Sequence, residues 1–217
     1  RAIQYKILES VLDQHALRLT VGRFEKAVAQ LDERLRLPLL DLAIPSLCTM
    51  SVPQHQHFRE TISKLIRADQ SVSRFEWAVH VVLARHLDQR IVGRRTGPKA
   101  THTLKRHHAD AVVVLATLAY LGAREKQAAE LAFRSGLAVL GGDASRMPTA
   151  NECGLDALDT ALGRLDQVRF ADRQRLLLAC EACIAQDGRT TVVEAETLRA
   201  IADAIDCPMP PILQEQQ

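Results

Sequence analysis

The sequence predicts an all-α protein, and three observations support that prediction. Leucine and alanine are abundant while aromatic residues make up only 4% of the 217 residues, a composition that favours helices packed on helices. Apolar residues recur at helical spacing, and no segment alternates between apolar and polar residues as a half-buried strand would. One helix–turn–helix pattern also occurs twice, which indicates a helical bundle with an internal duplication.

Each copy of the repeated pattern reads Asp, three residues, Ser or Thr, two residues and Glu. The copies are Asp69, Ser73 and Glu76, and Asp187, Thr191 and Glu194. The hydroxyl residue stands where a helix N-cap belongs and the glutamate follows three residues later, which is the spacing of a capping box. Gly188 suits the left-handed residue that ends the preceding helix. We therefore expect each copy to connect two helices, with Ser73 and Thr191 as the caps.

The first 50 residues are expected to form the N-terminal helices. Apolar spacing predicts helices over 2–19 and 23–35, with Gly22 as the break between them. In the apolar stretch 36–50, Pro38 suits the first helical position and Pro45 indicates a kink or a break. The chain begins without an initiator methionine or a visible signal peptide, so we expect it to be cut from a longer protein.

The rest of the chain is expected to alternate between helix pairs and connections. A single domain of residues 1–217 would hold a first repeat unit in 53–87, a basic connector in 88–106, central helices in 107–164 and a second repeat unit in 169–206. The run Ala109–Leu121 is strongly apolar but contains Asp110 and is shorter than the ~18 residues of a membrane span. We expect it to form a buried helix.

Composition and motifs argue against several function classes. The net charge of +2 gives no general reason to expect nucleic acid, and the sequence lacks H-E-x-x-H, glycine-rich phosphate loops and G-x-S-x-G. Cys180 and Cys183 have the spacing of half a zinc site, but both fall on an apolar helix face, which favours core packing. We expect a non-catalytic segment with reduced thiols, with His107 and His108 solvated beside the connector.

Two interpretations of the acidic turns remain open. Asp69, Glu76, Asp187 and Glu194 offer hard oxygen ligands, so two facing turns would suit a divalent cation such as Ca²⁺. Caps and Asx turns alone also explain every residue of the pattern.

The connector has an excess of basic residues, with glycine and proline among them. Its cations are Arg90, Arg94, Arg95, Lys99, Lys105 and Arg106. These suit the phosphate groups of an anionic membrane surface, whereas nucleic acid is disfavoured because no aromatic residues are interleaved for base stacking. A solvated flexible loop is the other interpretation.

The doubled turn resembles the TerB-like family of tellurite-resistance proteins. The resemblance rests on Asp187–Glu196 and on Ala68-Asp69 followed by Ser73 and Phe75-Glu76, and it covers both repeat units. It implies a duplicated all-helical domain whose acidic turns bind a divalent cation. Gln70 replaces the usual glycine of the first turn, which weakens that implication for Asp69 and Glu76.

Three further strings are similar to the C-terminal region of bacterial HtpX-like membrane zinc metallopeptidases. They are Leu39–Leu47, Arg74–Ala78 and Asp206–Pro211. The resemblance implies a non-catalytic cytosolic accessory domain, tethered to the inner membrane through an N-terminal part that carries the zinc motif. Its partner would be the rest of its own chain or another protein. The alternatives are a free-standing TerB-like stress protein that binds a divalent cation, and an anionic-surface binder that uses residues 90–106.

Overall fold

The predicted all-α class is confirmed. The computed structural model describes residues 2–66, 68, 73–93, 100–123, 125–141, 145–207 and 209, and within these ranges it contains helices and no strand. The chain divides into two compact units, residues 1–94 (unit 1) and 95–217 (unit 2). The division falls inside the predicted connector 88–106, so the two repeat units belong to different compact units. The single domain and the internal duplication stay predictions.

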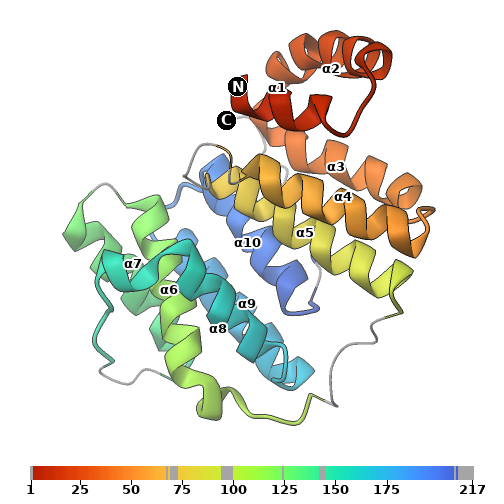
Figure 1. Ribbon diagram of the computed structural model, residues 1–217. Helices are drawn as coiled ribbons and strands as arrows, with labels where there is room; N and C mark the ends of the chain where they lie inside the picture. Colours follow the sequence, from red (N-terminus) through yellow and green to blue (C-terminus); the bar gives the residue numbers. More distant parts are fainter. Residues whose placement is uncertain are drawn as a thin grey trace. The chain divides into compact units, whose positions relative to one another are not determined.

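Unit 1 is built around one long helix. Its elements are α1 (Ala2–Glu9), α2 (Gln14–Ala29), the 3-10 helix η1 (Glu33–Leu35), α3 (Arg36–Leu47), α4 (Val52–Ile66) and α5 (Arg74–Ile91). Helix α5 packs against α3 and α4, and α1 packs against α4 and α2 (Figure 1). The predicted connector therefore begins later than residue 88, because α5 continues to Ile91.

The N-terminal helices differ from the prediction at three positions. The break lies between α1 and α2, where Asp13 caps α2 by accepting a hydrogen bond from the Ala16 N–H at 2.7 Å. Gly22 lies inside α2, because a glycine costs a helix only about 1 kcal/mol and neighbouring residues offset that cost. Pro38 is the third residue of α3, and Pro45 lies within its last turn without ending it.

Unit 2 surrounds a central helix. Its elements are η2 (Leu104–His107), α6 (His108–Gly122), α7 (Lys126–Val139), η3 (Ala150–Cys153), α8 (Leu155–Leu165), α9 (Phe170–Ile184) and α10 (Val192–Ala204). Helix α6 contacts α7, α8, α9, α10 and both 3-10 helices (Figure 1).

Helix α6 is buried on all sides, as predicted for the run 109–121. Residues 111, 112 and 114–119 are all buried, and a helix that is apolar all round is expected at the centre of a core. Gly136 of α7 lets the neighbouring helices approach closely, because a Cβ there would lie 2.7 Å from the Ala179 carbonyl oxygen. Cys180 and Cys183 are buried in α9, as predicted for core residues, and all five cysteines are free thiols.

Both predicted capping boxes are confirmed. The Ser73 and Thr191 side chains accept from the backbone N–H groups of Glu76 and Glu194, and each glutamate accepts from the backbone N–H of its cap. Gly188 has φ +74°, which is the left-handed conformation expected before the second cap.

One buried arginine joins the ends of three helices. Arg173, in the first turn of α9, donates from Nε to the Val168 oxygen, from Nη1 to the Ile205 oxygen and from Nη2 to the Asp166 oxygen, each at 2.6 Å. Asp166 and Val168 belong to the α8–α9 connection, and Ile205 follows α10. The guanidinium therefore satisfies carbonyl groups that the ends of α8 and α10 leave without helical partners.

The end of α10 has a left-handed residue that the contact with Arg173 helps to hold. Asp206 has φ +55° and is the non-glycine residue with positive φ within the described ranges. The Cys207 N–H donates to the Ala202 oxygen at 2.9 Å and the Asp206 N–H to the Asp203 oxygen at 3.1 Å, which together form a Schellman motif. The Asp206 carboxylate also lies 3.8 Å from Arg173, which favours this conformation without glycine.

We expect Arg173→Lys to lower the free energy of unfolding of unit 2 by about 3 kcal/mol. A lysine ammonium cannot reach three carbonyls at once, and each buried carbonyl left unpaired costs about 1–3 kcal/mol. Urea unfolding followed by circular dichroism measures the loss. Arg175→Lys is the matched control, because Arg175 is exposed and donates a single 3.2 Å bond to the Val139 oxygen. Equal losses in the two variants would contradict the role given to Arg173.

Candidate functional site

The predicted acidic site has two of its carboxylates engaged in their own caps. In unit 1, Glu76 Oε2 accepts from the Ser73 N–H at 2.9 Å. In unit 2, Glu194 Oε2 accepts from both the N–H and the hydroxyl of Thr191, each at 2.7 Å. Asp69 lies outside the described residues. These contacts are those of the capping interpretation.

The surroundings of Glu194 and Asp187 also favour roles within their own turn, as a cap residue and an Asx-turn residue. Glu194 is buried, and its carboxylate lies so close to Gly122 that a Cβ there would collide with it. Asp187 is exposed and accepts from the Arg189 N–H at 2.9 Å, as in an Asx turn. Among the described residues, no group of three or more His, Cys, Asp or Glu side chains is placed to hold a metal ion. The Ca²⁺ site across Asp69, Glu76, Asp187 and Glu194 stays a prediction.

The predicted anionic-surface residues are described only in part. Arg90 is exposed in the last turn of α5, and Lys105 and Arg106 are exposed on η2. Arg94, Arg95 and Lys99 lie outside the described residues.

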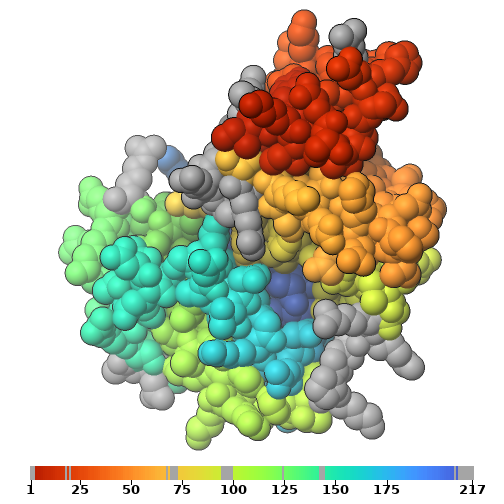
Figure 2. Space-filling view, viewed as in Figure 1, coloured from red at the N-terminus to blue at the C-terminus, as the bar shows by residue number. Residues whose placement is uncertain are grey.

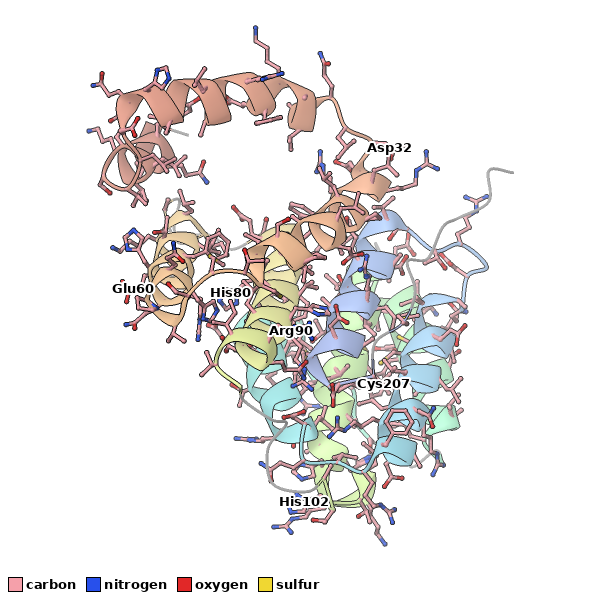
Figure 3. The ribbon with its side chains drawn as sticks, turned by 90° about the vertical axis from the view of Figure 1, so that its right-hand side faces the viewer. Asp32, Glu60, His80, Arg90, His102 and Cys207 are labelled. Atoms are coloured by element: carbon pink, nitrogen blue, oxygen red, sulfur yellow. The ribbon has the colours of Figure 1, made fainter. Side chains whose placement is uncertain are left out.

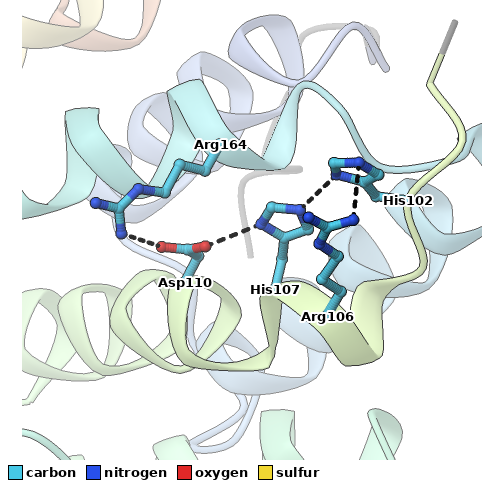
Figure 4. A network of polar contacts seen from close by, with 5 residues as sticks. All are labelled: His102, Arg106, His107, Asp110 and Arg164. Carbon is cyan, nitrogen blue, oxygen red and sulfur yellow. Dashed lines mark hydrogen bonds and ion pairs between the residues drawn. The ribbon is translucent and has the colours of Figure 1, made fainter.

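A polar network in unit 2 was not predicted from the sequence (Figure 4). His107 lies between His102 and Asp110: its Nε2 is 2.9 Å from His102 Nδ1, and its Nδ1 is 3.1 Å from Asp110 Oδ2. Arg106 Nη1 lies 3.3 Å from His102 Nε2 at one end, and Arg164 Nη1 donates to Asp110 Oδ1 at 3.2 Å at the other. Five side chains from η2, its flank, α6 and α8 thus form one chain of contacts.

The backbone fixes His102 at the start of this network. Its N–H donates to the Gln167 oxygen at 3.1 Å, and its carbonyl oxygen accepts from the Arg169 N–H at 2.9 Å. This pairing forms a parallel bridge between His102 and Val168, within the connection that Arg173 holds. The two imidazole rings stack with centroids 5.1 Å apart.

The chemistry of the two ends determines the tautomer of each histidine. Arginine can only donate and an ionised carboxylate can only accept, so His102 Nε2 must be unprotonated and His107 Nδ1 must carry a proton. His102 then donates from Nδ1 to His107 Nε2 and is itself neutral. An additional proton on either ring would place two donors face to face and break one link.

The electrostatic surroundings favour this neutral state for His102. Its pKa is lowered from 6.5, first by burial, then by the positive charge of Arg106, and last by the repulsion that a protonated His107 would exert. No nucleophile ends the chain of contacts, since Arg106 occupies the outer ring nitrogen. The arrangement is therefore suited to holding η2 against α6 and α8 rather than to activating a hydroxyl or thiol.

His107 and His108 were expected to be solvated, and that prediction is wrong. The His107 side chain is only 11% exposed, and His108 Nε2 lies 2.9 Å from Ser145 Oγ. The prediction rested on their position at the border of the basic connector, whereas η2 and the bridge at His102 bring His107 beside His102. Asp110, one turn after His107, was the available signal in the sequence.

The cysteines offer no reactive thiolate in the core. Burial raises the pKa of Cys180 well above its usual range and raises that of Cys183 to about 12, with a smaller effect from Glu194. A thiol that stays protonated is a poor nucleophile and a poor metal ligand.

Unit 1 exposes two apolar stripes. Leu17, Val21, Phe24 and Val28 follow one face of α2, and exposure rises from 7% at Leu17, which is buried, to 54% at Phe24. A second stripe continues from η1 into α3.

The second stripe consists of Leu35, Leu39 and Leu42, all of which are exposed. Leu42 is 77% exposed, whereas Leu37 on another face of α3 is only 2% exposed. Asp32, labelled in Figure 3, begins the turn between the two stripes and holds Arg34 in a two-bond ion pair, which lowers the pKa of Asp32 to about 2. In Figure 2 the part of the segment 2–47 whose placement is described is coloured red to orange.

No family model, curated protein or solved structure matches this chain. Among the described residues, no helix is both long enough and apolar enough to cross a membrane.

We expect the imidazole of His102 to titrate below pH 6.5 and the Arg106→Gln variant to raise its pKa. Removal of the guanidinium removes a charge that disfavours the imidazolium. Because the folded pKa is lowered, this histidine contributes stability that is present above pH 6.5 and is lost as the pH falls below it. NMR titration of the His102 ring protons in the wild type and in the variant gives both pKa values. An unchanged His102 pKa in the variant would contradict the assignment.

We expect Thr191→Ala to cost about 2 kcal/mol of unfolding free energy and Ser73→Ala about 1 kcal/mol. Thr191→Ala removes a hydroxyl that donates to the buried Glu194 carboxylate and accepts from the Glu194 N–H, whereas Ser73→Ala removes only a hydroxyl that accepts from the Glu76 N–H at an exposed cap. Urea unfolding of each variant measures the difference. The capping interpretation also requires Glu194→Gln to be less than additive with Thr191→Ala, since the two residues form one unit.

Proposed function

We propose that the chain is a non-catalytic accessory domain that binds another polypeptide through unit 1. The bound polypeptide is the remainder of its own chain or another protein. The parent, by the resemblance described above, is a membrane-anchored zinc metallopeptidase of bacteria, with this domain on the cytoplasmic side of the inner membrane.

The exposed apolar stripes of α2 and α3 are the observation that carries this proposal. Contiguous apolar residues on the surface of a folded protein mark interaction sites, while scattered ones do not. Phe24 and Val28 are one helical turn apart, and Leu35, Leu39 and Leu42 recur at i, i+4 and i+7. This spacing is that of a helix face made to pack against another helix.

The polar features of the stripes support a protein partner rather than a lipid one. Polar residues of both signs stand beside the stripes. Asp32 pairs with Arg34 and Glu33 with Arg36, and α2 carries exposed Arg23 and Lys26 next to Glu25. A polar rim of mixed charge suits a protein interface, whereas an interfacial membrane helix is expected to be dominated by cations on its polar face.

The two alternatives predicted from the sequence lack a comparable observation. For divalent-cation binding, the described glutamates Glu76 and Glu194 are engaged by their own caps. For anionic-surface binding, exposed Arg90, Lys105 and Arg106 are the described part of the cationic set. Both alternatives stay predictions.

We expect p-benzoylphenylalanine in place of Leu42 or Phe24 to crosslink to a defined partner segment when the intact gene product is expressed in bacteria. Mass spectrometry of the crosslinked peptides identifies the segment. The same probe at Leu178, which is exposed on α9, is the control because it lies outside both stripes. Equal crosslinking at Leu178, or none at positions 24 and 42, would reject the proposal.

The free energy of unfolding shows whether the exposed leucines of α3 form an interface or are needed for folding. Leu42→Ser should change the free energy of unfolding by less than about 0.5 kcal/mol, as at other surface positions, yet remove the crosslink from position 24. Leu37→Ala, on the buried face of the same helix, should cost about 2–5 kcal/mol.

A further inference from the structure

Unit 2 contains a hollow that neither the capping turns nor the histidine network uses. It has a volume of about 850 Å³ and lies between α7, the end of α6 and the segment 145–149. Its lining includes Tyr120, Phe133, Arg134, Leu137, Arg146 and Met147.

The floor of the hollow is apolar and preformed. Phe133 and Leu137 are buried and lie one turn apart on α7, so their places are fixed by the core. The Tyr120 hydroxyl donates to the Pro148 oxygen at 2.9 Å, which ties the segment 145–149 to α6. The apolar floor therefore does not need to form when a ligand binds.

The rim of the hollow has more positive than negative charge. Lys126, Arg134 and Arg146 face a single acid in the lining, Glu130. Lys126 lies 3.9 Å from Glu130, and Arg146 lies 3.7 Å from Glu152. Arg134 makes no ion pair or hydrogen bond with any residue that the structure describes, so its planar guanidinium is available to a carboxylate.

The remaining wall offers unpaired backbone groups. Within the described part of the chain, the N–H and C=O groups of Ser145, Arg146 and Met147 form no hydrogen bond. Thr149 is extended, with φ −72° and ψ 159°, and Pro148 biases Met147 toward an extended conformation as well. An extended peptide laid beside this segment would find backbone partners along it.

We propose that this hollow binds an extended acidic peptide, with an apolar side chain on Phe133 and Leu137, a carboxylate on Arg134 and backbone bonds to residues 145–147. The apolar floor alone would accept many ligands, but the backbone groups beside it select a polypeptide. The uncompensated guanidinium selects a negative charge, and charge-assisted bonds are about twice as strong as neutral ones. The inference goes beyond the proposed function, because it concerns unit 2 and none of the apolar stripes of unit 1.

Fluorescence anisotropy tests the proposal on the whole chain. The probe is a fluorescein-labelled heptapeptide of alternating aspartate and leucine, and the comparison peptides alternate lysine with leucine and aspartate with serine. We expect the aspartate–leucine peptide to bind at least about 10-fold more tightly than either comparison peptide, and the affinity to fall as salt rises. The absence of binding at about 1 mM peptide, the weak limit of a specific contact, would overturn the proposal.

Substitutions in the lining locate the site. Arg134→Ala should weaken binding of the aspartate–leucine peptide by at least about 10-fold, since one charge-assisted pair is lost. Arg189→Ala removes the same charge from an exposed turn of unit 2 outside the hollow and should leave the affinity unchanged. Equal effects of the two variants would show that only net charge matters and would reject the site.

A pair of variants at Ala138 keeps the test independent of any effect of Arg134 on folding. Ala138 is exposed and lines the hollow, so it accepts a longer side chain without disturbing the core. Ala138→Glu should weaken binding at least about 10-fold by repelling the peptide, whereas Ala138→Lys should preserve or strengthen it. Equal weakening by both, or by neither, would overturn the proposed charge selection. All of these variants lie in unit 2, so we expect them to leave binding at the apolar stripes of unit 1 unchanged, and the two proposals can fail separately.

Discussion

The guanidinium of Arg173 is the constraint on which much of unit 2 depends. It binds three carbonyl oxygens that helix ends would otherwise leave buried and unpaired. Two of them belong to the α8–α9 connection, and the same connection pairs with the backbone of His102. The histidine network therefore has its position because an arginine on another helix holds the loop beneath it. A single side chain thus links the packing of α8, α9 and α10 to the polar end of the unit.

The capping boxes and the buried helix were predictable from the sequence, because the residues that cause them lie close together along the chain. A hydroxyl followed by a glutamate three positions later defines a capping box, and both boxes are present at Ser73 and Thr191. The buried helix α6 was predicted for a similar reason, since apolar residues on all sides leave no face for water. The N-terminal break was misplaced at Gly22, because a cap at Asp13 outweighs the small cost of one glycine inside a helix.

Contacts between distant segments were not predictable in this way. His102 and His107 become partners only because the α8–α9 connection fixes the backbone of His102, and helical periodicity contains no information about that pairing. The hollow beside Arg134 likewise depends on where residues 145–149 cross α7. For the acidic turns the sequence predicted the capping role of Glu76 and Glu194 but left cation binding open, since a carboxylate oxygen serves both as a hydrogen-bond acceptor and as a ligand of hard cations.

The central position of α6 has a consequence for synthesis on the ribosome. This helix lies near the start of unit 2 in the sequence, whereas α9 and α10, which cover part of its surface, are made last. Until residue 204 has left the exit tunnel, a segment that is apolar on every side lacks part of its cover. Domains generally fold as units during translation, and transiently exposed apolar surface makes a nascent chain prone to aggregate. The order of its helices therefore makes the synthesis of α9 and α10 the step that completes the cover of α6.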